Sequence, residues 1–165
     1  MKWYGGVPIV TDVLEPIASS VVPRSSTKAC IDFICDDLNT AETLLARFTG
    51  SGQWMSGENY GRVTSGAAVA LLGRVRLLYA SPMFNRTNDV TRWTQAYEDI
   101  KRSIGVLTAA GYGLANESNP GINASGWASM FSQVPNTEGI FVTLYNTLVQ
   151  GTPDYRKNNT WEHGI

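Results

Sequence analysis

The sequence contains few of the side chains that bind metals or act as nucleophiles. Its 165 residues include one histidine, His163, and two cysteines, Cys30 and Cys35. On a helix these two cysteines lie about 140° apart around the axis, at roughly 100° per residue, so we do not expect them to bridge each other. A zinc site needs more Cys or His ligands close by. We therefore interpret the cysteines as small buried apolar residues and expect no metal.

Long apolar runs and a large excess of either charge are also missing. No apolar run is long enough for a transmembrane helix, and the first residues lack the apolar segment of a signal peptide. With 16% charged residues and a net charge of −1, the chain has no basic patch for nucleic acid. The 43% of hydrophobic residues is enough for a folded core. We expect one globular unit of modest size.

The common catalytic motifs are absent as well. Neither Gly-x-Ser-x-Gly nor the phosphate-binding Gly-x4-Gly-Lys-Ser/Thr occurs, and His163 lies in a polar tail. A glycosidase needs two carboxylates across a cleft, and no pattern in the sequence brings the least helical candidates, Glu58 and Glu138, together. Asp36 and Asp37 are adjacent on a predicted helix and point in different directions, which favours a solvated acidic face. We expect neither catalysis nor a cofactor.

What the sequence does have is a stretch rich in alanine and leucine at residues 64–85. Its apolar residues fall into two rows at steps of three and four, the spacing of an α-helix. One row is Ala68, Leu71, Val75 and Leu78, and the other, mostly small, is Gly66, Ala70, Gly73, Leu77 and Ala80. Two apolar rows predict an interior helix over 65–82, capped by Thr64 or Ser65 and ended by Pro82.

Two more helices are predicted from the same periodicity. The range 26–47, capped by Ser25 or Ser26, has an apolar face, and the range 92–110, capped by Thr91, has another. The inward positions are Ile31, Ile34, Cys35, Leu38, Ala41 and Leu45 in the first helix, and Trp93, Tyr97, Ile100, Ile104 and Leu107 in the second. Both helices are therefore expected to bury one side against a neighbour.

These elements predict a mostly α fold with tetratricopeptide-like antiparallel helix pairs. Long loops are predicted at 48–61 and 116–126, minor extended segments at 5–11 and 140–148, and a polar tail at 150–165. The pair 65–82 and 92–110 cannot bury both of its faces alone, so its partner is either the helix 26–47 or an element outside this sequence. Arg74 and Arg76 have to reach the surface or a partner, because burying an unpaired guanidinium is costly.

The order of residues in the central stretch carries a further signal. The relevant residues are Gly61-Arg62-Val63-Thr64-x-Gly66-Ala67-Ala68, Ala70-Leu71, Arg74 and Leu78-Tyr79-Ala80-Ser81-Pro82-x-Phe84-Asn85. This pattern resembles the central signature of the RagB/SusD family. Other segments agree in order, namely Tyr4 to Val10, Pro23-Arg24-Ser25, Asp36-Asp37-Leu38-x-x-Ala41 and Asn136-Thr137-Glu138-Gly139-Ile140-Phe141. The resemblance thus runs from about Tyr4 to Tyr145.

The resemblance implies a function and a location. RagB/SusD proteins are surface glycan-binding lipoproteins of Bacteroidetes-type bacteria and are several times longer than this chain. We therefore expect residues 1–165 to be an internal fragment of a larger SusD-like domain at the outer membrane, anchored through a lipid that the fragment lacks. The implied role is non-catalytic capture of an oligosaccharide or related nutrient during polysaccharide utilisation. The implied partner is a SusC-like TonB-dependent transporter, which receives the nutrient.

Aromatic residues in polar loops are the features that sugar binding needs, because a sugar ring has an apolar face and a rim of hydroxyl groups. Two clusters have this composition: Trp54 with Gln53, Asn59 and Tyr60, and Trp161 with Tyr155 and Arg156. We predict that these residues bind the ligand. Trp54 has an alternative role as a plug over a hydrophobic edge of the domain. The alternative function is a helical scaffold that binds a protein partner without touching glycan.

Overall fold

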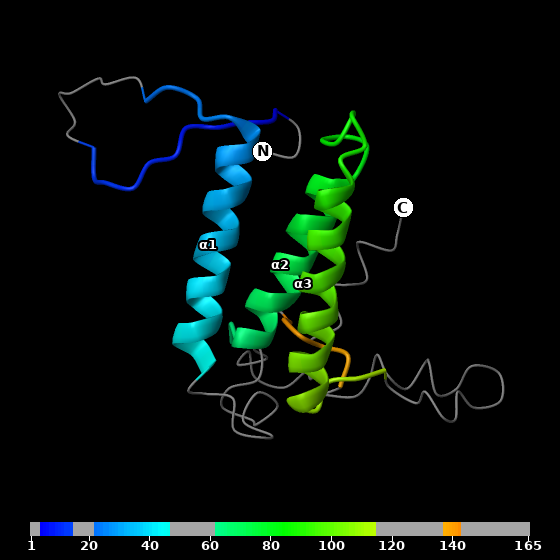
Figure 1. Cartoon of the computed structure of the whole chain (residues 1–165). Helices are drawn as coiled ribbons and strands as arrows, with labels where there is room; N and C mark the ends of the chain where they lie inside the picture. Colours follow the sequence, from blue (N-terminus) through cyan, green and yellow to red (C-terminus); the bar gives the residue numbers. More distant parts are fainter. Residues whose placement is uncertain (1–3, 15–21, 47–61, 115–136, 143–165) are drawn as a thin grey trace, which may run out of the picture.

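The computed structural model describes residues 4–14, 22–46, 62–114 and 137–142. Within these ranges lie three helices, each antiparallel to the next. They are α1 (Thr27–Leu45), α2 (Ser65–Ala80) and α3 (Val90–Ala109). In Figure 1, α1 runs downward, α2 runs upward and α3 runs downward again, with α2 packed against both of the others. This arrangement confirms the predicted fold class, a mostly α structure of tetratricopeptide-like antiparallel helix pairs.

Side chains that accept hydrogen bonds begin each helix. Ser26 Oγ accepts from the backbone N–H of Ala29 at 3.1 Å, and Thr64 Oγ1 accepts from that of Ala67 at 3.2 Å. Both residues were among the predicted caps. The cap of α3 is Asp89 and not Thr91 as predicted, because the Asp89 carboxylate accepts from both the backbone N–H and the hydroxyl of Thr91. The helix therefore begins two residues before the predicted range.

A buried asparagine organises the connection between α2 and α3. Asn85 Nδ2 donates to the carbonyl oxygens of Ala80 at 3.3 Å and Asp89 at 3.0 Å, while its Oδ1 accepts from the Asp89 N–H at 2.7 Å. Ser81 is extended, as expected for a residue that precedes Pro82. These bonds satisfy backbone groups at both helix ends and hold the two helices as a hairpin.

The core lies between α1 and α2. It consists of Ile31, Cys35, Leu72 and Tyr79, with Leu38, Val75 and Phe84 packed against it. Cys30 and Cys35 are both buried and unbridged, which confirms their interpretation as small buried residues. Burial raises the pKa of the Cys35 thiol, because a thiolate would lose its hydration there. The thiol is therefore neutral at physiological pH.

Small residues let α2 and α3 approach closely. A Cβ added to Gly73 would lie 3.0 Å from Cγ1 of Ile100, so the glycine marks the point of closest approach. Ser103 donates its hydroxyl to the carbonyl oxygen of Val69 at 2.7 Å, across the two helices. Arg76 Nε lies 3.2 Å from Asp99 Oδ2, and these side chains are 23% and 14% exposed. Close packing, one hydrogen bond and one largely buried ion pair thus join the hairpin.

The two predicted apolar rows of α2 are only partly buried. Leu71 and Leu77 are 48% and 46% exposed, although each row was expected to pack against a neighbour. The side chains that are buried instead include Val69, Leu72 and Tyr79. Because α2 is apolar almost all around, the periodicity of its sequence does not define which side faces the core.

The predicted inward stripe of α3 was wrong for three of its five members. Trp93, Tyr97 and Ile104 are 38%, 60% and 59% exposed. The side that meets α2 contains Ala96 and Ser103, which are buried. Close approach between helix backbones requires small side chains at the contact, and this requirement outweighs the burial of the larger apolar residues on the other side.

The N-terminal segment crosses the beginning of α1, as Figure 1 shows in dark blue. Val7 O accepts from the N–H of Ser25 at 3.1 Å, and Arg24 donates from Nε to Gly6 O at 2.9 Å and from Nη2 to Tyr4 O at 2.5 Å. Cys30 Sγ lies 3.4 Å from both Val7 N and Val7 O. The segment is extended without being a strand. The other predicted extended segment is described only at residues 140–142, which form a bend.

Candidate binding site

The predicted ligand-binding residues lie outside the part of the chain that the structure describes. These residues are Gln53, Trp54, Asn59, Tyr60, Tyr155, Arg156 and Trp161. The same holds for the loops 48–61 and 116–126 and for the tail 150–165. Of the two carboxylates considered for a hydrolase, Glu58 also lies outside, whereas Glu138 is described and exposed. Other residues, all of them described, line two hollows on the molecule.

A polar groove of about 280 Å³ lies where α1 and α3 begin and α2 ends. Its lining consists of Lys28, Asp32, Arg76, Tyr79, Asp89, Thr91, Arg92 and Gln95. All three helices contribute to it, and the antiparallel arrangement is what brings their ends together. We call this site the polar groove.

Ion pairs fix most of the charges in the polar groove. Lys28 Nζ lies 2.5 Å from Asp32 Oδ2, one helical turn away, and this bond raises the pKa of Lys28. Arg92 Nε lies 3.6 Å from Asp89 Oδ2, while its Nη1 donates to Phe84 O at 2.8 Å. The hydrogen bonds from the Thr91 hydroxyl and N–H lower the pKa of Asp89. Lys28 and Asp89 are consequently charged at neutral pH.

Positive and negative charges balance in the polar groove. Lys28 and Arg92 are paired with the carboxylates of Asp32 and Asp89, and Arg76 is paired with Asp99 just outside the lining. A ligand would therefore meet alternating hydrogen-bond donors and acceptors with no strong net charge. Such a lining suits the hydroxyl groups of a neutral sugar.

The groove does not offer an open aromatic surface. Tyr79 is largely buried, and the guanidinium carbon of Arg92 lies 4.1 Å from the centroid of its ring. This cation–π contact stabilises the wall of the groove. A sugar ring that stacks on an aromatic side chain would need that side chain from elsewhere in the protein.

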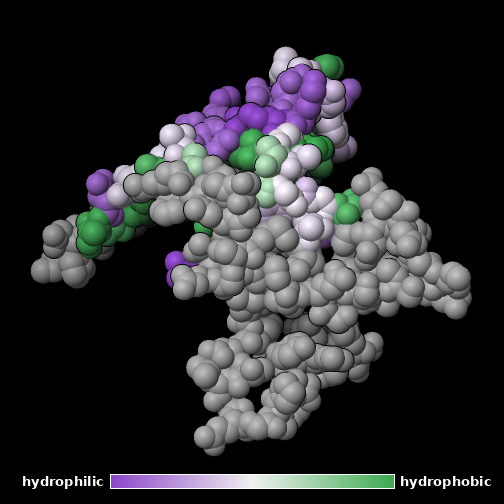
Figure 2. Space-filling model, turned by 90° about the horizontal axis from the view of Figure 1, so that it is seen from below, coloured by the Kyte–Doolittle hydropathy of each residue, from purple (hydrophilic) through white to green (hydrophobic). Residues whose placement is uncertain are grey.

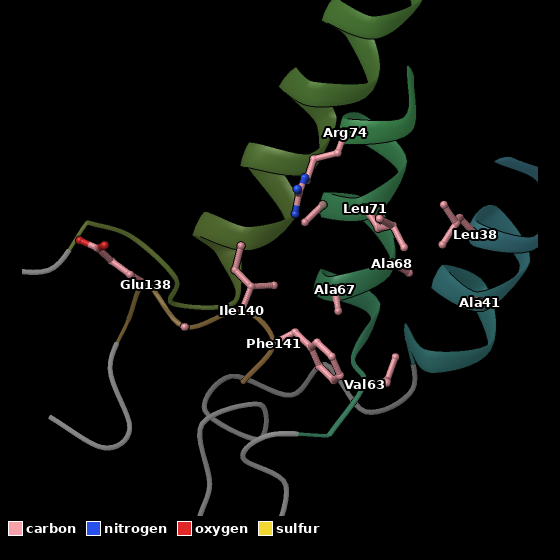
Figure 3. A pocket seen from close by; sticks show the side chains of 12 residues that line it. Leu38, Ala41, Val63, Ala67, Ala68, Leu71, Arg74, Glu138, Ile140 and Phe141 are labelled. Carbon is pink, nitrogen blue, oxygen red and sulfur yellow. The ribbon is translucent and has the colours of Figure 1, made fainter. Parts of the chain in front are cut away.

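A second hollow, the apolar pocket, has a volume of about 510 Å³. Its walls are Leu38 and Ala41 of α1, the first half of α2 with Val63 before it, and residues 138–141. In Figure 3, Ile140 and Phe141 approach α2 from the side opposite α1, and Arg74 extends over the upper edge. Glu138 lies at the far side with its carboxylate directed away from α2.

Hydrophilic and hydrophobic side chains are separated on one end of the molecule. Viewed from the end at which α1 and α3 finish (Figure 2), hydrophilic side chains gather in one broad band, and hydrophobic and near-neutral side chains lie beneath it.

In the described ranges, no helix combines the length and apolar composition needed to span a bilayer. Nor do the described residues contain three or more His, Cys, Asp or Glu grouped as a metal site would require.

Sequence reasoning missed both hollows. The residues of the polar groove extend from Lys28 to Gln95 and share no spacing, so only the packing of three helices reveals them. The apolar pocket was missed because Leu71 was assigned to a packed row. One signal did point to it: Arg74 was expected to reach the surface or a partner, and it is exposed at the pocket.

Comparison with known proteins identifies a likeness among solved structures. No protein-family model and no curated protein matches the sequence. Among solved structures, a SusD-like protein from Bacteroides fragilis NCTC 9343 superposes with a TM-score of 0.62 and 30% sequence identity. The alignment covers 93% of this chain and 24% of that one, so the chain spans about a quarter of the SusD-like protein's length.

This likeness agrees with the three antiparallel helices and with the residue pattern around α2. The alignment covers nearly all of the chain, well beyond the three helices. The chain therefore has a SusD-like fold.

Proposed function

We propose that this chain is part of a non-catalytic protein that captures an oligosaccharide or related nutrient at the bacterial cell surface. The observation that carries the proposal is the similarity to a SusD-like protein over 93% of the chain. The polar groove supports it, because its donors and acceptors are balanced in charge. Capture would be non-covalent and would need no cofactor.

Two sets of residues in the chain are proposed to bind the ligand. The polar groove pairs with sugar hydroxyl groups through residues such as Lys28 and Gln95. Separately from the groove, Trp54 and Trp161 stack on sugar rings, as the sequence predicts. The whole protein would be a lipid-anchored component of the outer membrane and would pass its ligand to a SusC-like TonB-dependent transporter.

Titration of the full chain with neutral oligosaccharides tests this function. Binding should release heat in calorimetry and quench tryptophan fluorescence. Lys28→Ala should weaken binding about three- to tenfold, the effect of losing one hydrogen bond, because Lys28 lines the groove. Lys101→Ala is the matched control, since Lys101 lies outside the groove over the ring of Tyr97. It should leave the affinity unchanged.

The stacking residues are tested by the same titration. Trp54→Ala or Trp161→Ala should remove the fluorescence quench while circular dichroism shows unchanged helix content. If a broad panel of neutral oligosaccharides gives neither heat nor quenching with folded protein, the capture function is contradicted.

The exposed side of α3 favours a second candidate function, a scaffold that binds a protein partner. Val90, Trp93, Tyr97 and Ile104 are large apolar residues with substantial exposure on one helix. Such a surface is typical of a contact site for another protein. Binding of a TonB-dependent channel protein that is lost with Tyr97→Asp, together with absence of glycan binding, would support the scaffold.

A further inference from the structure

The outer face of α2 is apolar apart from Arg74. Two adjoining hollows lie on it. One is the apolar pocket of about 510 Å³, and the other is a further hollow of about 540 Å³ that extends to Ser81. Leu71 and Arg74 line both, so the hollows form one continuous surface. We call it the α2 outer face. Its residues are Val63, Ala67, Ala70, Leu71, Arg74, Leu77 and Leu78.

The shape of the α2 outer face suits a helix. Ala67 and Ala70 are small, whereas Leu71 and Leu77 project beside them. Small side chains between larger ones form the grooves into which the ridges of a second helix pack, at about 8–10 Å between axes. The 16 residues of α2 offer roughly 24 Å of length, enough for about four turns of a partner.

A single cation lies in the middle of this apolar surface. Arg74 forms no ion pair with any residue that the structure describes, in contrast to Arg76, which is paired with Asp99. A partner that covered the surface would strip water from the Arg74 guanidinium. That burial is tolerated when the partner places a carboxylate against it, and the resulting pair is strong and directional.

We propose that the α2 outer face docks an amphipathic partner helix with large apolar side chains at helical spacing and one carboxylate opposite Arg74. A second copy of this chain is a poorer occupant, because a twofold pairing of the same faces opposes one Arg74 to the other. The surface is separate from the polar groove and from the exposed side of α3, so it adds to the proposed function.

Selection from a display library of helical peptides tests the proposal. The full chain is the target, and the library varies the charge and size of each residue on one helix face. Selected peptides should carry leucine-type residues at steps of three and four and Asp or Glu at one position. Leu71→Asp should weaken their binding at least about tenfold. Phe33→Asp, at an exposed apolar position of α1 that lines neither hollow, is the matched control and should have no effect.

A charge swap identifies the contact with Arg74. Arg74→Glu should weaken the acidic peptide at least about tenfold, and replacing its carboxylate by lysine should restore binding to this variant. The proposal is overturned if selected peptides show no acidic preference or if their binding is lost with Phe33→Asp and retained with Leu71→Asp. It is also overturned if ultracentrifugation shows self-association that Leu71→Asp abolishes, because the occupant is then a second copy.

Discussion

Gly6 lies where the N-terminal segment crosses the residues that precede α1. A Cβ at this position would lie 1.9 Å from the carbonyl oxygen of Ser25, so any larger residue must push the backbones apart. Gly6→Ala should therefore lower the free energy of unfolding by about 1–3 kcal/mol, the usual range for overpacking. Urea denaturation followed by circular dichroism measures the change.

Gly105 provides the matched control for this substitution. A Cβ there meets nothing within 4 Å, and the residue lies inside α3. Gly105→Ala should raise the free energy of unfolding by about 0.5–1 kcal/mol, because alanine favours the helix. Equal stability of Gly6→Ala and the unaltered protein would contradict the close crossing.

Cys35 makes stability depend on pH. Burial raises the pKa of its thiol in the folded chain, so the unfolded chain releases this proton first as the pH rises. The stabilising contribution is complete below the unfolded pKa, about 8.5, and is lost as the pH rises toward the folded pKa. Denaturation at pH 7 and pH 9.5 should show the loss. Cys35→Ala should make the loss smaller, and an unchanged difference would contradict the prediction.

At the scale of the helix, neighbouring residues at the start of α2 should respond in opposite directions. Thr64→Ala removes the cap of the Ala67 N–H and should cost about 1 kcal/mol. Ser65 Oγ is buried and finds no hydrogen-bond partner among the described residues. Ser65→Ala should therefore be neutral or stabilising by up to about 1 kcal/mol, since it removes an unsatisfied polar group. Thermal unfolding of both variants decides, and destabilisation by Ser65→Ala would count against this assignment.

The existence of the helices could be predicted because their causes are local. Spacing of apolar residues identified α2, and Ser26 and Thr64 were among the expected caps. The orientation of the helices could not be predicted in the same way. The close approach at Gly73 and Ile100 selects the contact side of α3, and it depends on residues 27 positions apart in sequence. Hydrophobic periodicity gives little weight to small residues such as Gly73 and Ala96, so Trp93 and Tyr97 were assigned to the wrong side.

The candidate site was less predictable than the fold. A composition of aromatic and polar residues led to loops outside the described ranges, so those residues remain a prediction. The polar groove consists of ordinary charged residues, such as Lys28 and Arg92, whose importance arises only from their meeting at one end of the helices. No sequence pattern encodes that meeting.

For the molecule as a whole, the distribution of exposed apolar residues makes a sharp prediction. Ile31 is 0% exposed and Ile104 is 59% exposed, although both were expected to face inward. Ile104→Lys should change the free energy of unfolding by no more than about 0.5 kcal/mol. Ile31→Lys should prevent folding, because it buries a charge without a partner. Circular dichroism of the two variants compares them.

Conservative variants at the same two positions test the difference in burial even if Ile31→Lys does not fold. Ile31→Val should lower stability by about 0.5–1.5 kcal/mol, whereas Ile104→Val should have almost no effect. If both valine variants lose the same stability, Ile104 is buried in solution, which contradicts the orientation of α3 described here.

The connection around Asn85 also bears on the order in which the structure assembles. It joins α2 to α3 across residues 81–89, whereas α1 reaches α2 across residues 46–64. Closing a shorter loop loses less chain entropy, so the α2–α3 hairpin should form early and α1 should dock onto it afterwards. Changes at Asn85 should then slow refolding, while changes at Gly6 should mainly hasten unfolding.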